Sequence, residues 1–407
     1  MSWTRREFTK AALTALPGVA LFERGLGAAG LLQAGPNSLI NGVQIGVITY
    51  SYRSMPDQSA EATLKYVVDS GISAIELMGG PVNDWARKKG NWDASPAAAA
   101  AAASAAAQAA ASGGGRGARG GGGGGREGGA PPSYAPVAGM AMGPDNNQPA
   151  GQWNGTPCPA PGARGGGGGG RGRGAGQAEL TPDQQAAQRA AQTAAEEERK
   201  WRLGLSMDIF TELRQMYNDA GVSIYAVKDV RQQTDEDLDY TFTVAKTLGA
   251  SHVTLELPTN ENASATLKRL GDTALRHQMF VAYHTHQQGT MTAFDEAFAI
   301  SRGNMANIDL GHFVAAQNPG GTPLDFLNKF HDRIASFHLK ERTTQQHCAL
   351  NLAWGTGETP IKEILQLMKQ NQWKFPATIE VEYAIPEGST PVLEVRKCLE
   401  YARAALA

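Results

Sequence analysis

Short apolar runs alternate with longer helical patterns from Val43 to the end of the chain. The apolar runs have the length of buried strands, and the segments between them carry apolar residues at helical spacing. This pattern predicts eight strands, at 43–50, 72–77, 222–227, 252–257, 279–284, 307–310, 334–339 and 377–382. Alternating strands and helices form parallel sheets with right-handed crossovers, and eight such units close into a barrel. The sequence therefore predicts an α/β fold, a (β/α)8 TIM barrel.

An open, doubly wound sheet is the competing fold. Such a sheet usually carries a glycine-rich phosphate loop after its first strand. Here that position reads Ser51-Tyr52-Arg53, which contains no glycine. The barrel is therefore the favoured arrangement.

The composition changes abruptly after the second predicted strand. Residues 94–112 are almost pure alanine, and residues 113–175 are dominated by glycine, arginine and proline. Such a segment buries too little apolar surface to offset its ordering entropy, so we expect a disordered, low-complexity insertion. A helical pattern resumes at Thr181-Pro182 and runs to residue 221. The expected organisation is a leader at 1–35, barrel strands one and two at 42–92, the insertion at 93–178 and the remainder of the barrel at 179–407.

The first residues have the features of an export signal. The run from Thr4 to Lys10, with adjacent Arg5 and Arg6, resembles a twin-arginine motif, and an apolar stretch of about twelve residues follows it. That stretch is shorter than the ~20 residues needed to span a bilayer. We expect the twin-arginine export machinery to be a partner, a periplasmic or otherwise extracytoplasmic location, and no stable membrane span after processing. The alternative is a basic amphipathic helix that stays on the chain.

Charge and cysteine content exclude some classes of function. The formal net charge is -2, and the arginines of the insertion have no interleaved aromatic residues, so no nucleic-acid partner is expected. The three cysteines, Cys158, Cys348 and Cys398, are widely spaced and form no CxxC pair. The sequence therefore predicts unpaired thiols.

Carboxylates and imidazoles follow five consecutive predicted strands, four to eight. In a barrel, the carboxyl ends of the strands carry the functional residues. All eight histidines fall between positions 252 and 347. Several carboxylates buried together cost several kcal/mol per uncompensated charge unless a cation is present, which favours a divalent ion such as Mn, Mg, Co or Zn. The residues at these strand ends are Glu256, His284, His286, Asp309, His312, His338, Lys340, Glu380 and Glu382.

Three short strings at the ends of strands six to eight resemble those of the xylose-isomerase-like superfamily, the sugar phosphate isomerase/epimerase family. They are Asp309-x-x-His312, His338-x-Lys340 and Ile379-Glu380. The strings 49–53 and 283–286 match a common subgroup of that family, and the resemblance spans 43–404 apart from the insertion. It implies a metal-dependent barrel whose ion is held by four side chains: Glu256, Asp309, His338 and Glu380.

The resemblance also implies the chemistry. Family members act on a hydroxy-ketone through a metal-bound enediolate, with two carboxylates that remove and return a proton. Glu256 and Glu380 match these catalytic positions, although Glu382 shares the face of Glu380 and remains open as the ligand. The residues expected to bind substrate are His284, His286, His312, Lys340, Glu382, Lys228 and Arg53.

The expected function is isomerisation or epimerisation of a free sugar or ketose, a small-molecule substrate. Sugar phosphates are scarce outside the cytoplasm, so an exported protein favours an unphosphorylated substrate. The first alternative is a metal-dependent lyase or dehydratase that acts on a 3-keto-glycoside. The second is a non-catalytic barrel that binds a sugar.

Overall fold

The computed structural model describes residues 35–95, 98, 152–154, 156–158, 182–317 and 320–407. The predicted twin-arginine leader and most of the predicted insertion lie outside the described residues. The residues from Pro36 onward form one compact unit. No helix within the described ranges has the length and apolar character needed to cross a membrane.

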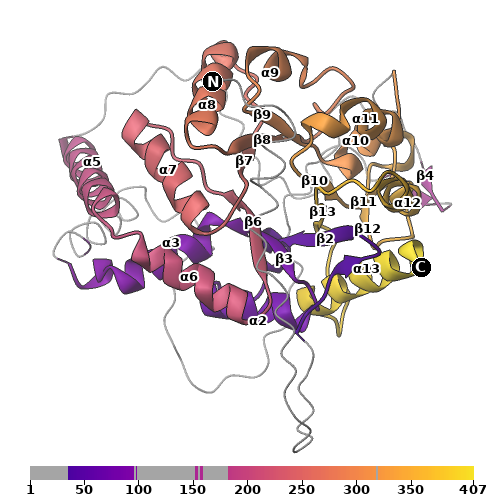
Figure 1. Ribbon diagram of the computed structural model, residues 1–407, viewed down its shortest axis with the longest axis horizontal. Helices are drawn as coiled ribbons and strands as arrows, with labels where there is room; N and C mark the ends of the chain where they lie inside the picture. The colour runs from indigo at the N-terminus through magenta and orange to yellow at the C-terminus, as the bar shows by residue number, and fades with distance from the viewer. Residues whose placement is uncertain (1–34, 96–97, 99–151, 155, 159–181, 318–319) are drawn as a thin grey trace, which may run out of the picture. The chain divides into compact units, whose positions relative to one another are not determined.

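Eight parallel strands form the centre of the part of the chain that the structure describes (Figure 1). They pair in the order β10-β13-β2-β3-β6-β7-β8-β9, and a short β1 (Leu39–Ile40) joins β2 antiparallel. Two isolated parallel bridges, Ala306 to Ile334 and Asp309 to His338, join β9 to β10 and nearly close the ring. The predicted (β/α)8 barrel is confirmed. Its strands are β2 (Val43–Ile48), β3 (Ala74–Met78), β6 (Ser223–Lys228), β7 (His252–Glu256), β8 (Phe280–His284), β9 (Asn304–Asn307), β10 (Phe337–Leu339) and β13 (Ala377–Ile379).

The helices lie outside the strands (Figure 1). Local sequence signals set where several of them begin: Ser59, Thr234 and Thr390 each accept a hydrogen bond from a backbone N–H in the first turn. The helices of the barrel layer are α2 (Ala60–Asp69), α3 (Gly79–Lys89), α6 (Asp208–Asp219), α7 (Asp235–Thr247), α8 (Ala263–Arg276), α9 (Asp295–Ile300), α10 (Leu310–Ala316), α11 (Pro323–Phe330), α12 (Ile361–Asn371) and α13 (Pro391–Leu406).

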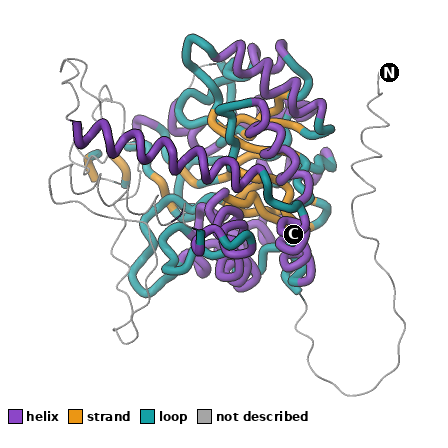
Figure 2. The backbone as a smooth tube through the Cα atoms, turned by 90° about the vertical axis from the view of Figure 1, so that its left-hand side faces the viewer, coloured by secondary structure: helices purple, strands orange, loops and turns teal. Residues whose placement is uncertain are grey.

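The helical pattern from 182 to 221 forms two helices, where the sequence predicts one. Helix α5 (Pro182–Leu203) ends at Gly204, and α6 begins four residues later. Helix α5 lies outside the other helices (Figures 1 and 2). Arg199 and Arg202 attach it to α7 through the buried carboxylate of Asp237, at 3.0 and 2.9 Å. The break at the glycine lets α5 turn away while α6 packs on the barrel.

Strand six lies earlier in the sequence than its apolar pattern predicts. The predicted strand 307–310 is replaced by β9, which ends at Asn307. Asp309 is instead the N-cap of α10, and its Oδ1 accepts a hydrogen bond from the His312 backbone N–H at 2.8 Å. Capping by an aspartate outweighs strand formation here, because it satisfies a backbone donor at the start of the helix.

A layer of polar side chains crosses the barrel near the amino ends of the strands. Tyr225 and Thr378 share a hydrogen bond of 2.8 Å between their hydroxyl groups, and His252 Nε2 lies 2.9 Å from Ser336 Oγ. Burial lowers the pKa of His252 to about 4, so its imidazole is neutral at pH 7. This layer forms the floor of the barrel interior.

A disulfide joins part of the predicted insertion to the loop after β10. Strands β4 (Gln152–Trp153) and β5 (Thr156–Pro157) pair antiparallel, and Cys158, which follows them, is bonded to Cys348. The Trp153 ring also lies 5.5 Å from the His347 ring, measured between centroids. The prediction of unpaired thiols is therefore wrong for these two cysteines, while Cys398 is a buried free thiol. Sequence spacing gave no signal for the bond, because 190 residues separate its ends.

Candidate metal centre

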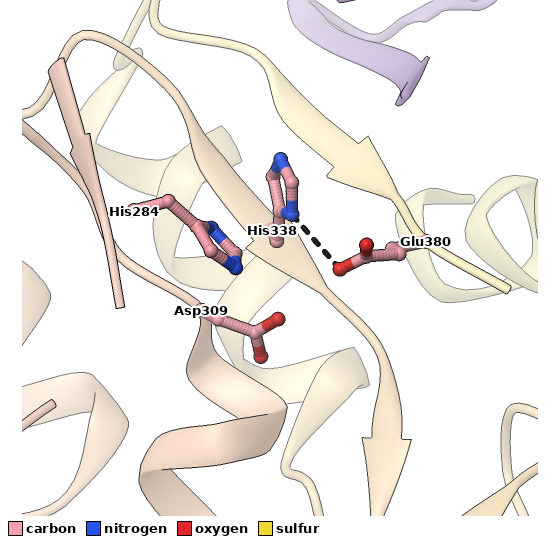
Figure 3. A group of neighbouring side chains, drawn as sticks. All are labelled: His284, Asp309, His338 and Glu380. Carbon is pink, nitrogen blue, oxygen red and sulfur yellow. Dashed lines mark hydrogen bonds and ion pairs between the residues drawn. The ribbon is translucent and has the colours of Figure 1, made fainter. Parts of the chain in front are cut away.

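Four ligand-type side chains meet at the carboxyl ends of neighbouring strands. His284 ends β8, Asp309 follows β9, His338 lies in β10 and Glu380 follows β13. One ligand atom from each of these side chains lies within 4.8 Å of the others, and all four side chains are buried. Figure 3 shows the four side chains pointing toward one another. Donor atoms that share an ion at ~2.0–2.2 Å are separated by at most about 4.4 Å, so the group is close to the size of a metal site.

His338 lies between two carboxylates. Its Nδ1 is 2.9 Å from Glu380 Oε2, and its Nε2 is 2.8 Å from Glu76 Oε2. Burial alone would lower the pKa of His338, but the carboxylates of Glu76 and Glu380 outweigh burial and raise it to about 10. The imidazole therefore carries two protons at pH 7 when no metal ion is bound.

Lys340 places an ammonium group beside the same carboxylates. Its Nζ lies 2.9 Å from Asp309 Oδ2, 2.9 Å from Glu380 Oε2 and 2.6 Å from Glu382 Oε2. The side chain is only 3% exposed, and burial alone would lower its pKa. The three carboxylates outweigh burial and hold the pKa above its usual range. Lys340 therefore neutralises part of the negative charge that the cluster concentrates.

The residues present fit a divalent ion. The donor set is two imidazoles and two carboxylates, which suits Mn, Co or Zn and is compatible with Mg. His284 Nδ1 is buried and has no hydrogen-bond partner among the described residues. Burial, reinforced by Lys228, lowers the pKa of His284 well below its usual value. A neutral imidazole with a buried, unpartnered nitrogen is the form that ligates metals. His284, Asp309, His338 and Glu380 are therefore the side chains that would hold the ion.

Glu256 lies next to this group and is not one of its four members. Its carboxylate is 49% exposed and lies 3.0 Å from Lys228 Nζ and 3.4 Å from His286 Nδ1. It forms a second group of possible ligands with His284 and His286. The resemblance assigns Glu256 as the strand-four ligand, but His284 is the fourth member of the buried cluster. Glu256 instead stands at the mouth of the barrel, where a substrate would enter.

The remaining predicted substrate-binding residues line the same end of the barrel. His312 is buried, its ring centroid lies 4.8 Å from that of His286, and its Nε2 is 3.9 Å from Glu382 Oε2. Arg53 has a different kind of contact: its guanidinium donates hydrogen bonds to the backbone oxygens of Val381 and Tyr50. It thereby connects the segments that follow β13 and β2. The structure therefore brings His286, His312, Lys340 and Glu382 together, and gives Arg53 a contact with the main chain.

Two charged residues at the site were missed by sequence reasoning. Arg342 is buried in the short strand β11 (Glu341–Arg342), which follows β10, and its Nη1 lies 2.7 Å from His312 Nδ1. Glu76 lies inside the barrel on β3 and is fully buried. Glu76 gave a usable signal: it is the single charged residue in the apolar run Ala74–Met78, and a buried charge without a structural need often marks a functional site.

Sequence identity between this chain and the proteins it matches is low. Neither the scan against protein-family models nor the search of curated proteins finds a match. Among solved structures, the chain is similar to a sugar phosphate isomerase/epimerase from Parabacteroides distasonis, with 13% identity over 92% of this chain and 98% of that chain and a TM-score of 0.47. It is also similar to the probable 3-DHS dehydratase AsbF from Bacillus anthracis, with 11% identity over 88% of this chain and 99% of that chain and a TM-score of 0.45. A third match is a D-psicose 3-epimerase, with 12% identity over 50% of this chain and 83% of that chain and a TM-score of 0.34. Two further matched structures are described as xylose isomerase domain proteins, from Planctomyces limnophilus and Alicyclobacillus acidocaldarius.

Proposed function

We propose that this protein is a divalent-metal-dependent isomerase or epimerase that acts on a free sugar or ketose. The observation that carries the proposal is the buried convergence of His284, Asp309, His338 and Glu380 at the carboxyl end of a (β/α)8 barrel. A bound divalent ion would polarise the carbonyl and hydroxyl oxygens of a hydroxy-ketone and stabilise the negative charge that develops on them. The remaining chemistry belongs to the side chains of the chain itself.

Two carboxylates on different sides of the mouth supply the proton transfers. Glu256, oriented by Lys228 and His286, removes a proton from the carbon next to the substrate carbonyl, and the C–H electron pair moves to form a new C=C bond as the carbonyl electrons move onto oxygen. Glu380 is ionised in the resting site, because Lys340 and His338 outweigh burial and hold its pKa well below the ordinary value. It therefore returns a proton only after taking one up from the neighbouring Lys340 ammonium, whose Nζ lies 2.9 Å away. Return to the other face of the same carbon inverts that centre, and return to the neighbouring carbon moves the carbonyl.

The polar lining of the mouth is suited to a polyol. His286, His312 and Lys340 can donate hydrogen bonds, and the carboxylates of Glu256 and Glu382 can accept them from hydroxyl groups. These residues lie at or after the carboxyl ends of five different strands, β7, β8, β9, β10 and β13, so they can contact several carbons of one substrate. An unphosphorylated sugar, which offers both donors and acceptors, matches that mixture.

An extracytoplasmic location is part of the proposal. It is supported by the twin-arginine motif at Arg5-Arg6 and by the Cys158–Cys348 disulfide, since disulfides persist mainly in oxidising compartments. Fractionation of cells that express the full chain, with a periplasmic marker as control, measures the location directly. Recovery of the mature chain only in the cytoplasm would contradict the proposal.

Metal analysis followed by a substrate panel in D2O tests the function. We expect the purified protein to contain about one divalent ion per chain, and Asp309→Asn to lose both the ion and turnover. Asp272→Asn, on the exposed surface of α8, is the matched control and should retain both. Full turnover after chelation of the metal would contradict the proposal.

The products decide between the reaction classes. Deuterium incorporated into an intact ketose or aldose indicates isomerisation or epimerisation. Release of the substituent from a 3-keto-glycoside would show a lyase, and sugar binding without exchange or turnover would show a binding protein. Either of these last two results overturns the proposed reaction.

A further inference from the structure

Glu76 is a buried carboxylate with three hydrogen-bond partners inside the barrel. Its Oε2 lies 2.8 Å from His338 Nε2 and 3.2 Å from Asn307 Nδ2, and its Oε1 accepts from Thr254 Oγ1 at 2.6 Å. The residue is 0% exposed. These partners come from β10, β9 and β7, so the carboxylate is fixed from several directions.

His338 uses its two ring nitrogens on opposite sides. Nδ1 faces Glu380 within the group of four possible ligands, and Nε2 faces Glu76, which is outside that group. Figure 3 shows the ring nitrogen that faces Glu380. A 180° turn of the ring would place a C–H group at each of these two positions and would remove both contacts with the carboxylates.

We propose that Glu76 is a positioning residue for the metal: it holds the proton of His338 on Nε2, so that Nδ1 is the atom presented to the divalent ion. This inference rests on the proposed function, because it assumes that the ion is bound. A ligating imidazole must be neutral, with one nitrogen free for the ion and the other carrying its proton. The hydrogen bond to Glu76 selects which nitrogen plays which part.

A simple structural ion pair between Glu76 and His338 is the competing interpretation. The contacts of Glu76 favour the positioning role, because three donors remain even when His338 is neutral: the Nε2–H group, the Thr254 hydroxyl and the Asn307 amide. The carboxylate is thus satisfied in the state that binds metal. A carboxylate that orients a ligating histidine in this way typically changes metal affinity by 10–100-fold.

The wild-type protein gives the first test. Zinc is diamagnetic, so long-range proton–nitrogen spectra of the zinc-loaded full chain can report which ring nitrogen carries the proton, with the His338 signals assigned from their loss in His338→Gln. We expect a proton on Nε2 and a metal-shifted Nδ1. A proton on Nδ1 with zinc on Nε2 would overturn the inference.

Variants give the second test. Glu76→Gln should raise the zinc dissociation constant by about 10–100-fold, measured by competition with a chelating dye at fixed pH. The spectrum of this variant should show a mixture of His338 tautomers in place of one. Glu394→Gln is the matched control: it removes another buried carboxylate, one that accepts from Tyr383 and lies on α13, and zinc affinity should not change. Circular dichroism shows whether each variant is folded. If Glu76→Gln does not fold, the proton–nitrogen spectrum of the zinc-loaded wild type decides the question without the variant.

The two proposals fail in different ways. If the wild type binds zinc and Glu76→Gln binds it equally well, Glu76 is only an ion-pair partner and the proposed function is unaffected. If the wild type binds no divalent ion under any condition, the proposed function itself is overturned.

Discussion

Replacement of Lys340 by methionine tests how the candidate metal centre balances its charge. Methionine keeps most of the side-chain volume but removes an ammonium that lies 2.6–2.9 Å from three carboxylates. Removal of one partner from a buried ion pair costs about 3–5 kcal/mol, because the remaining charge is left uncompensated. For a domain of this size, a loss of about 4 kcal/mol corresponds to a fall in Tm of roughly 8–16 °C.

A divalent ion should reverse much of that loss. An ion at 100 times its dissociation constant stabilises the wild type by about 2.7 kcal/mol. In Lys340→Met the same ion would enter a cluster with one more unbalanced negative charge, so it should bind more tightly and raise the Tm by more. The two effects together predict a variant that is unstable in chelator and recovers strongly in metal.

Thermal unfolding in EDTA and across a Mn²⁺ titration measures both effects. Lys268→Met, which breaks an exposed pair with Asp272 on α8, is the control and should behave as the wild type does. The reasoning is refuted if Lys340→Met loses no more stability than Lys268→Met in EDTA. It is also refuted if metal raises the Tm of Lys340→Met no more than that of the wild type.

Three further predictions concern other parts of the chain. The pKa of His252 is about 4 in the folded protein and ordinarily near 6.5, so the unfolded chain takes up a proton first as the pH falls. Stability is therefore complete above pH 6.5 and falls by about 3 kcal/mol toward pH 4, and denaturant titrations of His252→Gln, which does not titrate, should show a smaller loss over that interval. Deletion of residues 94–176 should leave a soluble barrel that unfolds cooperatively, as followed by circular dichroism; aggregation on deletion would show that the barrel needs this segment. Arg5→Lys combined with Arg6→Lys should keep the chain in the cytoplasm, and export at the normal level would mean that the leader works by another route.

The order of the barrel could be predicted from the sequence because each strand is a short apolar run that the helical patterns separate. The prediction was least accurate where one residue has two roles. Asp309 follows an apolar run that favours a strand, but its carboxylate caps α10 and so ends β9 earlier. A pattern of apolar residues indicates which positions are buried. It does not show whether a polar residue among them will cap a helix and so end the strand.

The sequence predicts which strand ends carry the candidate site, and the structure adds His284 to the side chains that meet there. Asp309, His338 and Glu380 converge as expected because their strands are neighbours in the ring. Whether Glu256 or His284 completes the group depends on the direction of each side chain at a strand end, which spacing cannot fix. Glu76 contacts His338 across the barrel, from a strand 262 residues earlier in the chain, and such a contact leaves no local trace in the sequence.

Together with the proposed twin-arginine export, the disulfide would set an order of events during maturation. In the part of the chain that the structure describes, the eight barrel strands pair with one another, and β2 also pairs with β1. None of these pairings involves the segment that carries Cys158, so strand pairing does not require its bond to Cys348. Twin-arginine export carries folded proteins, and the compartment in which they fold keeps thiols reduced. A chain that follows this route would fold its barrel first, cross the membrane with both thiols free, and acquire the covalent link only afterwards. The link attaches Cys158 to the connection that follows β11, the strand that carries Arg342, the partner of His312. The entrance of the site would therefore be completed at the destination, after the ion-binding cluster is already formed.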